Sequence, residues 1–251
     1  MSHGYQLTRK ALFFHIRSMI QRLTTLTPPF KMVPILKGKT KSDFEIVIAR
    51  YDEDIHWSDN YIEYRTIYNK GEPLDCESIP LENKGHLADT ILTHILRRYD
   101  TLAKTTFFCH GSFNYRMDQQ IKESGPCNKL WQDFISVKEN TCVYIPREDL
   151  EHHSVRYEPN SKTVGELYEQ FFKRKYKPTF HWACGLWISV SDSLIRRQPI
   201  SFYKELYDWV LEGNPSQATY RERGIYIERF LLHAFLVPRT VSTRVLKSKW
   251  V

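Results

Sequence analysis

Phe44-Glu-Ile-Val-Ile-Ala49 is a short apolar run rich in β-branched residues, and it predicts a buried strand. A similar run, Thr105-Thr-Phe-Phe-Cys109, predicts a second buried strand further along the chain. Between them, apolar residues recur at helical spacing from about residue 85 to 99, as in an amphipathic helix. Strands that alternate with helices predict the α/β class, with a layered sheet and helices on both of its faces.

The rest of the chain continues this alternation. Thr163-Val-Gly-Glu166 has the pattern of a capping box, which predicts the start of a helix. Pro146 is expected to stop a strand over residues 141–145, and Pro199 to end a short helix capped by Ser191. The other expected elements are strands over Tyr61–Tyr68 and Phe180–Val190 and helices over Ile200–Leu211 and Tyr226–Phe235.

The composition bounds the class of protein. Of the 251 residues, 41% are hydrophobic and 14% aromatic, which excludes a disordered chain, a collagen-like fibre and a disulfide-stapled miniprotein. Residues 1–41 are expected to form a helical and linker segment, and residues 42–251 a single domain. Charged residues interrupt the N-terminal apolar stretch, so we expect neither a signal peptide nor a membrane span. We therefore expect a cytoplasmic protein.

The charge balance favours an anionic partner. The chain has 36 Lys and Arg residues against 29 Asp and Glu, a formal net charge of +7. The basic residues are dispersed and lie among acidic loops, an arrangement that nucleic-acid backbones disfavour. Two alternatives to an enzyme remain open: a basic nucleic-acid-binding module and a non-catalytic carbohydrate-binding module.

Polar residues follow three of the expected strands, at Arg50–Asp54, Asn69-Lys-Gly71 and His110-Gly111. In open α/β sheets, ligands bind beyond the carboxyl ends of the strands, where these segments would lie. A carboxylate there suits ribose hydroxyls and an arginine suits phosphate, while Lys70 could place an ammonium group beside a diphosphate. Each segment is also compatible with an ordinary solvated turn.

Three further features have both a functional and a structural reading. Asp52-x-Asp54 spells an Asp-x-Asp metal motif, but that motif normally follows a later strand, so Mn²⁺ or Mg²⁺ is doubtful and no metal ligand is assigned. Arg196 and Arg197 either neutralise a leaving diphosphate or complement a helix C-terminus. Glu228 is either a general base for a hydroxyl nucleophile or a first-turn helix acid.

Several segments together resemble a family of uncharacterised domains from fungi, algae and large DNA viruses. The resemblance is carried by Ala49-Arg-Tyr-Asp-Glu-Asp-Ile-His-Trp57 with Tyr68-Asn-Lys-Gly71, by Phe107-Phe-Cys-His-Gly111, and by Gly185-Leu-Trp-Ile-Ser-Val-Ser191 with Glu228-Arg229. Such domains look like GT-A-type glycosyltransferases, which implies a single domain with a Rossmann-like mixed sheet flanked by helices. It also implies a UDP-linked donor, a glycan acceptor and, by analogy with viral capsid-glycan enzymes, a pentose such as xylose.

The resemblance also implies roles for residues. Phe108–Gly111 would occupy the place of the metal-binding Asp-x-Asp, so metal dependence is in doubt, and Glu228 would be the base of an inverting enzyme. The predicted donor-binding residues are Arg50, Tyr51, Glu53, Asp54, Asn69, Lys70, Gly71, His110, Gly111, Arg196 and Arg197.

Overall fold

The structure is a computed structural model of the whole chain. It describes residues 36, 38–113, 134, 139–148, 162–175, 181–213, 216–236 and 242–245. Most of the expected N-terminal segment therefore lies outside the described residues. Leu36, however, is fully buried, and the Tyr64 hydroxyl donates to its carbonyl oxygen at 3.2 Å. The packed domain thus includes residues before 42.

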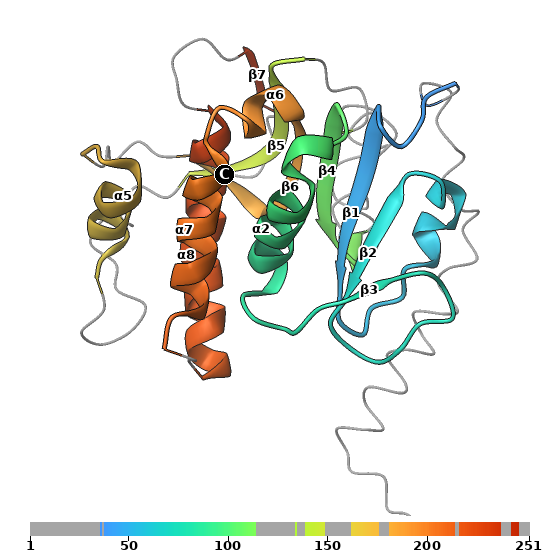
Figure 1. Cartoon of the computed structure of the whole chain (residues 1–251), viewed down its shortest axis with the longest axis horizontal. Coiled ribbons are helices and arrows are strands. Elements are labelled where there is room, and N and C mark those ends of the chain that lie inside the picture. The colour runs from blue at the N-terminus through green and yellow to red at the C-terminus, as the bar shows by residue number, and fades with distance from the viewer. Residues whose placement is uncertain are drawn as a thin grey trace, which may run out of the picture.

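The centre of the fold is a seven-stranded mixed sheet in the order β3-β2-β1-β4-β6-β5-β7 (Figure 1). All neighbouring strands run parallel except β6, which is antiparallel to both β4 and β5. The α/β class and the mixed sheet are confirmed. The strands are β1 Phe44–Arg50, β2 Arg65–Asn69, β3 Ile79–Pro80, β4 Thr105–His110, β5 Thr141–Glu148, β6 His181–Ser191 and β7 Ser242–Val245.

Helices of the described segments connect the strands. The α-helices are α2 His86–Arg98, α5 Val164–Phe172, α6 Asp192–Ile195, α7 Ile200–Leu211 and α8 Gln217–Leu236, and the 3-10 helices are η2 His56–Tyr61 and η3 Tyr99–Thr101. Helix α7 has the predicted bounds. The predicted capping box of α5 is confirmed, because the Glu166 amide donates to Thr163 Oγ1 at 3.1 Å and the Thr163 amide donates to the Glu166 carboxylate at 2.6 Å.

The side chains of β1 alternate between two hydrophobic cores. Val47 and Ala49 face a large core with residues of α2, α5, α7 and α8. Ile46 and Ile48 face a smaller core on the other side of the sheet, built largely from aromatic residues of η2 and the segments around it. Within the described residues, the long helices cover one face, and the second face is covered by η2 together with the helical residues Phe113 and Phe134.

Three expected elements differ from the structure, and two observed strands were not expected. The strand predicted over Tyr61–Tyr68 begins only at Arg65, because Tyr61 ends η2 and the next three residues form a turn, in which the Tyr64 amide donates to Tyr61 O at 2.9 Å. Strand β5 continues through Pro146, where its register against β6 shifts, and such an irregularity tolerates a residue without an N–H donor. Helix α8 begins at Gln217 rather than Tyr226. The two short strands β3 and β7 were not predicted.

Candidate functional site

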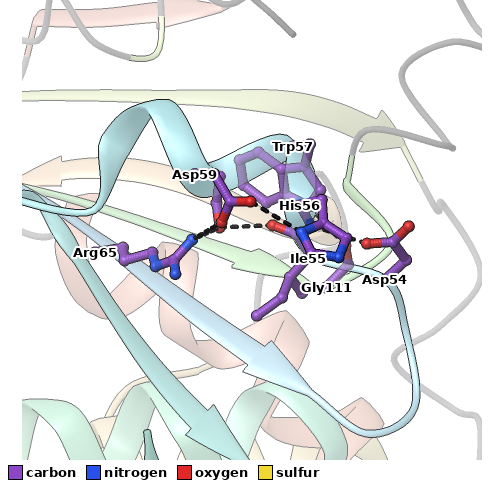
Figure 2. Close-up of polar contacts among 8 residues, drawn as sticks. Asp54, Ile55, His56, Trp57, Asp59, Arg65 and Gly111 are labelled. Atoms are coloured by element: carbon purple, nitrogen blue, oxygen red, sulfur yellow. Dashed lines mark hydrogen bonds and ion pairs between the residues drawn. The ribbon is translucent and has the colours of Figure 1, made fainter. Parts of the chain in front are cut away.

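The sheet has a topological switch point beside β1. The chain leaves β1 to form β2 and β3 on one side, and later returns to form β4 on the other. The segments that follow β1 and β4 therefore diverge at one end of the sheet, which is where open α/β sheets bind ligands. We call this end, where β1, β2 and β4 finish at Arg50, Asn69 and His110, the loop edge. Two contacts join these segments: the Gly111 amide donates to Ala49 O at 2.8 Å, and Trp57 Nε1 donates to Gly111 O at 2.8 Å (Figure 2). The sequence prediction that these strand ends meet is confirmed.

Arg50 and Asn69 are the paired last residues of β1 and β2, and they bond to each other. Arg50 Nη1 donates to Asn69 Oδ1 at 2.8 Å and to Glu72 O at 2.6 Å, while its Nε donates to Glu53 O at 3.2 Å. Asn69 Nδ2 donates to Glu72 O at 2.8 Å. Both side chains are buried. The main effect of Arg50 is therefore to hold the loops after β1 and β2 together.

The loop after β1 turns tightly and presents polar groups at the edge. The Tyr51 amide donates to Glu53 Oε2 at 2.6 Å, and the His56 amide donates to Asp54 Oδ1 at 2.9 Å. These bonds fix the carboxylates of Glu53 and Asp54, both half-buried. The Tyr51 side chain is 51% exposed, which makes it a large aromatic surface beside them.

Two glycines allow the loops to pack closely. A Cβ at Gly71 would lie 1.9 Å from Tyr51 O, and a Cβ at Gly111 would lie 3.0 Å from Glu53 Cβ. Neither position has room for a side chain without moving the loop after β1. Gly71 and Gly111 therefore shape the site by close approach.

Lys70 lies at this edge but points to the opposite face of the sheet from Asn69, toward α2. Its ammonium group bonds to Asp89 Oδ1 and to His86 O at the start of α2. The side chains of Lys70 and Asp89 are each only 3% exposed. Burial lowers the pKa of Lys70, and burial raises the pKa of Asp89 to about 6. The interpretation of Lys70 as part of a solvated turn is therefore wrong, because its side chain is buried in an ion pair, and its role beside a diphosphate stays a prediction.

His110 and Glu228 lie on the same side of the sheet as α2. His110, the last residue of β4, is half-buried and pairs with Ala49, whose side chain faces that core. Glu228 is half-buried in α8. Four residues earlier, a Cβ at Gly224 would lie 2.7 Å from Gly85 O, the residue before α2. This close contact brings the first half of α8 to the edge where Lys70 and His110 lie.

Arg196 and Arg197 lie at the opposite edge of the sheet. Strand β6 runs antiparallel to β4, so Ser191 at its end pairs with Thr105 at the start of β4. The short helix α6 then places Arg196 against the end of α2, where its guanidinium lies over the Tyr99 ring and bonds to Tyr99 O. Figure 1 shows α6 near the top of the domain and β3, on the side of the sheet where β1 and β2 end, in its lower part. The structure does not bring these arginines together with Lys70.

A histidine that the sequence analysis did not select stands beside the loop after β1. His56 Nδ1 lies 2.9 Å from Asp59 Oδ2, and Arg65 Nη1 donates to Asp59 Oδ1 at 2.7 Å (Figure 2). The hydrogen bond to Asp59 and the charge of Asp54 raise the pKa of His56. The His-x-x-Asp spacing directly after an acidic loop was the available signal, but it has meaning only once the turn of η2 is known.

In the residues that the structure describes, no group of three or more His, Cys, Asp or Glu side chains is arranged to hold a metal ion. None of the helices in those residues combines the length and the apolar character needed to cross a membrane.

The chain matches a known protein family. The model of a family described as "Protein of unknown function (DUF3431)" matches residues 46–242. The chain belongs to this family. The matched region spans β1 to the start of β7 and so contains the whole loop edge. No curated protein and no solved structure matches the chain.

Proposed function

We propose that this member of the DUF3431 family is a glycosyltransferase that transfers a sugar from a UDP-linked donor to a glycan hydroxyl. The observation that carries the proposal is the convergence of three polar strand ends at the topological switch point of the sheet. A mixed sheet flanked by helices also fits the GT-A-like fold that the sequence resemblance implies. A xylose donor is the specific case to test first.

The loop after β1 suits the nucleoside part of such a donor. The exposed ring of Tyr51 offers a stacking surface for a base, and base–aromatic stacking contributes about 1–3 kcal/mol per base. The carboxylate of Asp54, held by the His56 amide, is placed to accept hydrogen bonds from ribose hydroxyls. Acidic loops of this kind repel a nucleic-acid backbone but not the hydroxyls of a sugar.

Glu228 is the proposed general base. In an inverting transfer, its carboxylate takes the proton of the acceptor hydroxyl while the oxygen forms a bond to the anomeric carbon. The bond from that carbon to the diphosphate breaks, and its electron pair leaves with the phosphate oxygen. Glu228 is half-buried in α8, one helical turn after Gly224, which packs against Gly85 at the start of α2, and this position supports the role.

Donor binding tests the function directly. Isothermal titration with UDP-xylose, UDP-glucose, a GDP-sugar and a CMP-sugar, with and without Mn²⁺, should show one preferred class. Tyr51→Ala should weaken its binding about 5- to 150-fold if the ring stacks on the base. Ile200→Ala is the matched control, because Ile200 is 44% exposed at the opposite edge of the sheet. No binding of any nucleotide sugar would reject the proposal and favour a non-catalytic carbohydrate-binding or nucleic-acid-binding module.

Glu228→Gln tests the mechanism. The variant should lose at least a hundredfold in turnover with donor affinity unchanged, because general-base catalysis contributes about 10²–10⁴-fold. Glu222→Gln is the control: Glu222 is also half-buried in α8, six residues earlier and so on a different side of the helix. Full activity of Glu228→Gln would remove Glu228 from the mechanism.

A further inference from the structure

The proposed function leaves the charge of the departing diphosphate without a cation. Arg196 and Arg197 lie at the far edge of the sheet, and Lys70 is buried against Asp89. Arg50 is committed to Asn69 and to the carbonyl of Glu72. When the sugar is transferred, a nucleoside diphosphate departs with additional negative charge. Another residue near the loop edge must therefore supply a positively charged hydrogen-bond donor.

His56 has the geometry of such a donor. Its ring has two nitrogens, and Nδ1 lies 2.9 Å from the carboxylate of Asp59. Arg65 holds the other oxygen of this carboxylate at 2.7 Å, so Asp59 is fixed from both sides. The His56 side chain is 83% exposed, and among the described residues no partner contacts Nε2. The ring is therefore oriented through Nδ1, while Nε2 faces solvent.

The backbone of His56 is fixed to the same loop that carries the proposed donor site. Its amide donates to Asp54 Oδ1 at 2.9 Å, and the next residue, Trp57, donates to Gly111 O at 2.8 Å. Figure 2 shows Asp54 and His56, which follow β1, close to Gly111, the first residue after β4. The imidazole thus stands at the switch point of the sheet.

The charges around His56 favour its protonated form. The groups that act on it are the carboxylates of Asp59 and Asp54, which favour the imidazolium, and the guanidinium of Arg65, which opposes it. The balance raises the pKa of His56 above its ordinary value. With His56 protonated, the charges of these four side chains sum to zero, whereas with a neutral imidazole the two carboxylates and one guanidinium would sum to −1 and repel an anion.

We propose that His56, positioned by Asp59, donates a hydrogen bond from Nε2 to the diphosphate of the nucleotide-sugar donor and stabilises it as the leaving group. This inference rests on the proposed glycosyltransferase function. When the bond between the anomeric carbon and the phosphate oxygen breaks, the electron pair stays on that oxygen and the imidazolium faces the new negative charge. The acceptor proton goes to Glu228, so the two residues have separate roles.

The affinities for UDP and for uridine distinguish this role from a structural one. His56→Gln should weaken UDP binding about tenfold or more, because a hydrogen bond to a charged group is lost, and leave uridine binding unchanged. Asp59→Asn keeps the imidazole but lowers its pKa, so UDP affinity should begin to fall at a lower pH than in the wild type. Asp208→Asn is the control, since Asp208 is an exposed carboxylate in an ion pair with Lys204 on α7.

Each result of the titrations decides one of the two proposals. Equal UDP affinity in the wild type and His56→Gln, measured at pH 6.5 and 8.5, would overturn the role of His56 while leaving the transferase function intact. Equal loss of UDP and uridine affinity would also overturn it, because His56 would then act only by shaping the loop. A wild-type chain that binds neither UDP nor any nucleotide sugar would overturn the proposed function and this inference with it.

Discussion

Lys70 and Asp89 form a buried ion pair between the end of β2 and the first turn of α2. The same carboxylate accepts the amide of Lys84 at 3.2 Å, and Lys70 also bonds to the carbonyl of His86. The pair therefore connects the loop edge to the helix that covers the sheet. Two charges removed from water stabilise a fold only when each has its partner, so removal of one should cost more than removal of both.

Single changes at this pair should be strongly destabilising. Lys70→Met leaves Asp89 buried and unpaired, and we expect a loss of about 3–5 kcal/mol in the free energy of unfolding. Asp89→Leu should cost a similar amount for the same reason. The double variant should lose clearly less than the sum of the two, as urea unfolding would show. Additive losses would mean that the two charges do not depend on each other.

Gly71→Ala should disrupt the loop edge. Its Cβ would meet the backbone oxygen of Tyr51 at 1.9 Å, so one of the two loops must move. We expect nucleotide-sugar binding to be lost in a chain that still folds. Gly38→Ala is the control: its φ of +80° costs about 1–2 kcal/mol for alanine, but nothing lies within 4 Å of its Cβ. If both variants bind a donor equally well, the close approach at Gly71 does not shape the site.

His94 should make the stability of the domain depend on pH. This side chain is buried between the sheet and α2, 3.3 Å from the Tyr68 hydroxyl and 3.5 Å from the Glu45 carboxylate. Burial, with the charges of Arg98 and Lys41, lowers the pKa of His94 from 6.5 to about 3. As pH falls through 6.5, His94 becomes protonated in the unfolded chain but stays neutral in the folded chain. The free energy of unfolding therefore falls between pH 6.5 and the lowered pKa of about 3.

The size of this effect can be measured against a variant. Between pH 7 and 5, His94 should contribute a loss of about 2 kcal/mol in the free energy of unfolding, at roughly 1.4 kcal/mol per pH unit below 6.5. Urea unfolding of the wild type and His94→Gln at both values isolates this contribution, because the other titrating groups are shared. A wild type that loses no more than the variant would show that folding does not lower the pKa of His94.

Most strands and helices of the fold could be predicted from local sequence patterns. The apolar run of β1, the spacing of α2 and the capping box of α5 each depend on residues close in sequence, and each was found within a residue or two. The missed strands β3 and β7 are edge strands of two and four residues, which exist only because a neighbour offers hydrogen bonds. For β7 that neighbour is β5, which lies far earlier in the sequence, while β3 is too short to show a pattern of its own.

The candidate site was predictable to a smaller extent. Strand order alone brings Arg50, Asn69 and His110 to one edge, so the convergence of their loops followed from the α/β pattern. The partners of the side chains did not follow from it. Whether Lys70 faces solvent or Asp89 depends on the face of the sheet to which it points and on where α2 begins. The end of the sheet at which Arg196 lies depends on the direction of β6, which runs antiparallel to β4.

Arg196 provides a direct test of the separation between the two sheet edges. Its guanidinium lies over the Tyr99 ring with 5.7 Å between the carbon and the ring centroid, bonds to Tyr99 O and lies 3.5 Å from Asp192 Oδ2. These contacts complement the C-terminal end of α2, where a positive charge is favourable.

Arg196→Ala should therefore lower the free energy of unfolding by about 1 kcal/mol and leave UDP affinity unchanged, because the proposed donor site lies at the opposite edge. Arg196→Lys should recover part of the stability, since the charge returns without the planar group that stacks on Tyr99. A tenfold loss of UDP affinity in Arg196→Ala would place the diphosphate at the edge of α6 and remove it from the loops after β1 and β4.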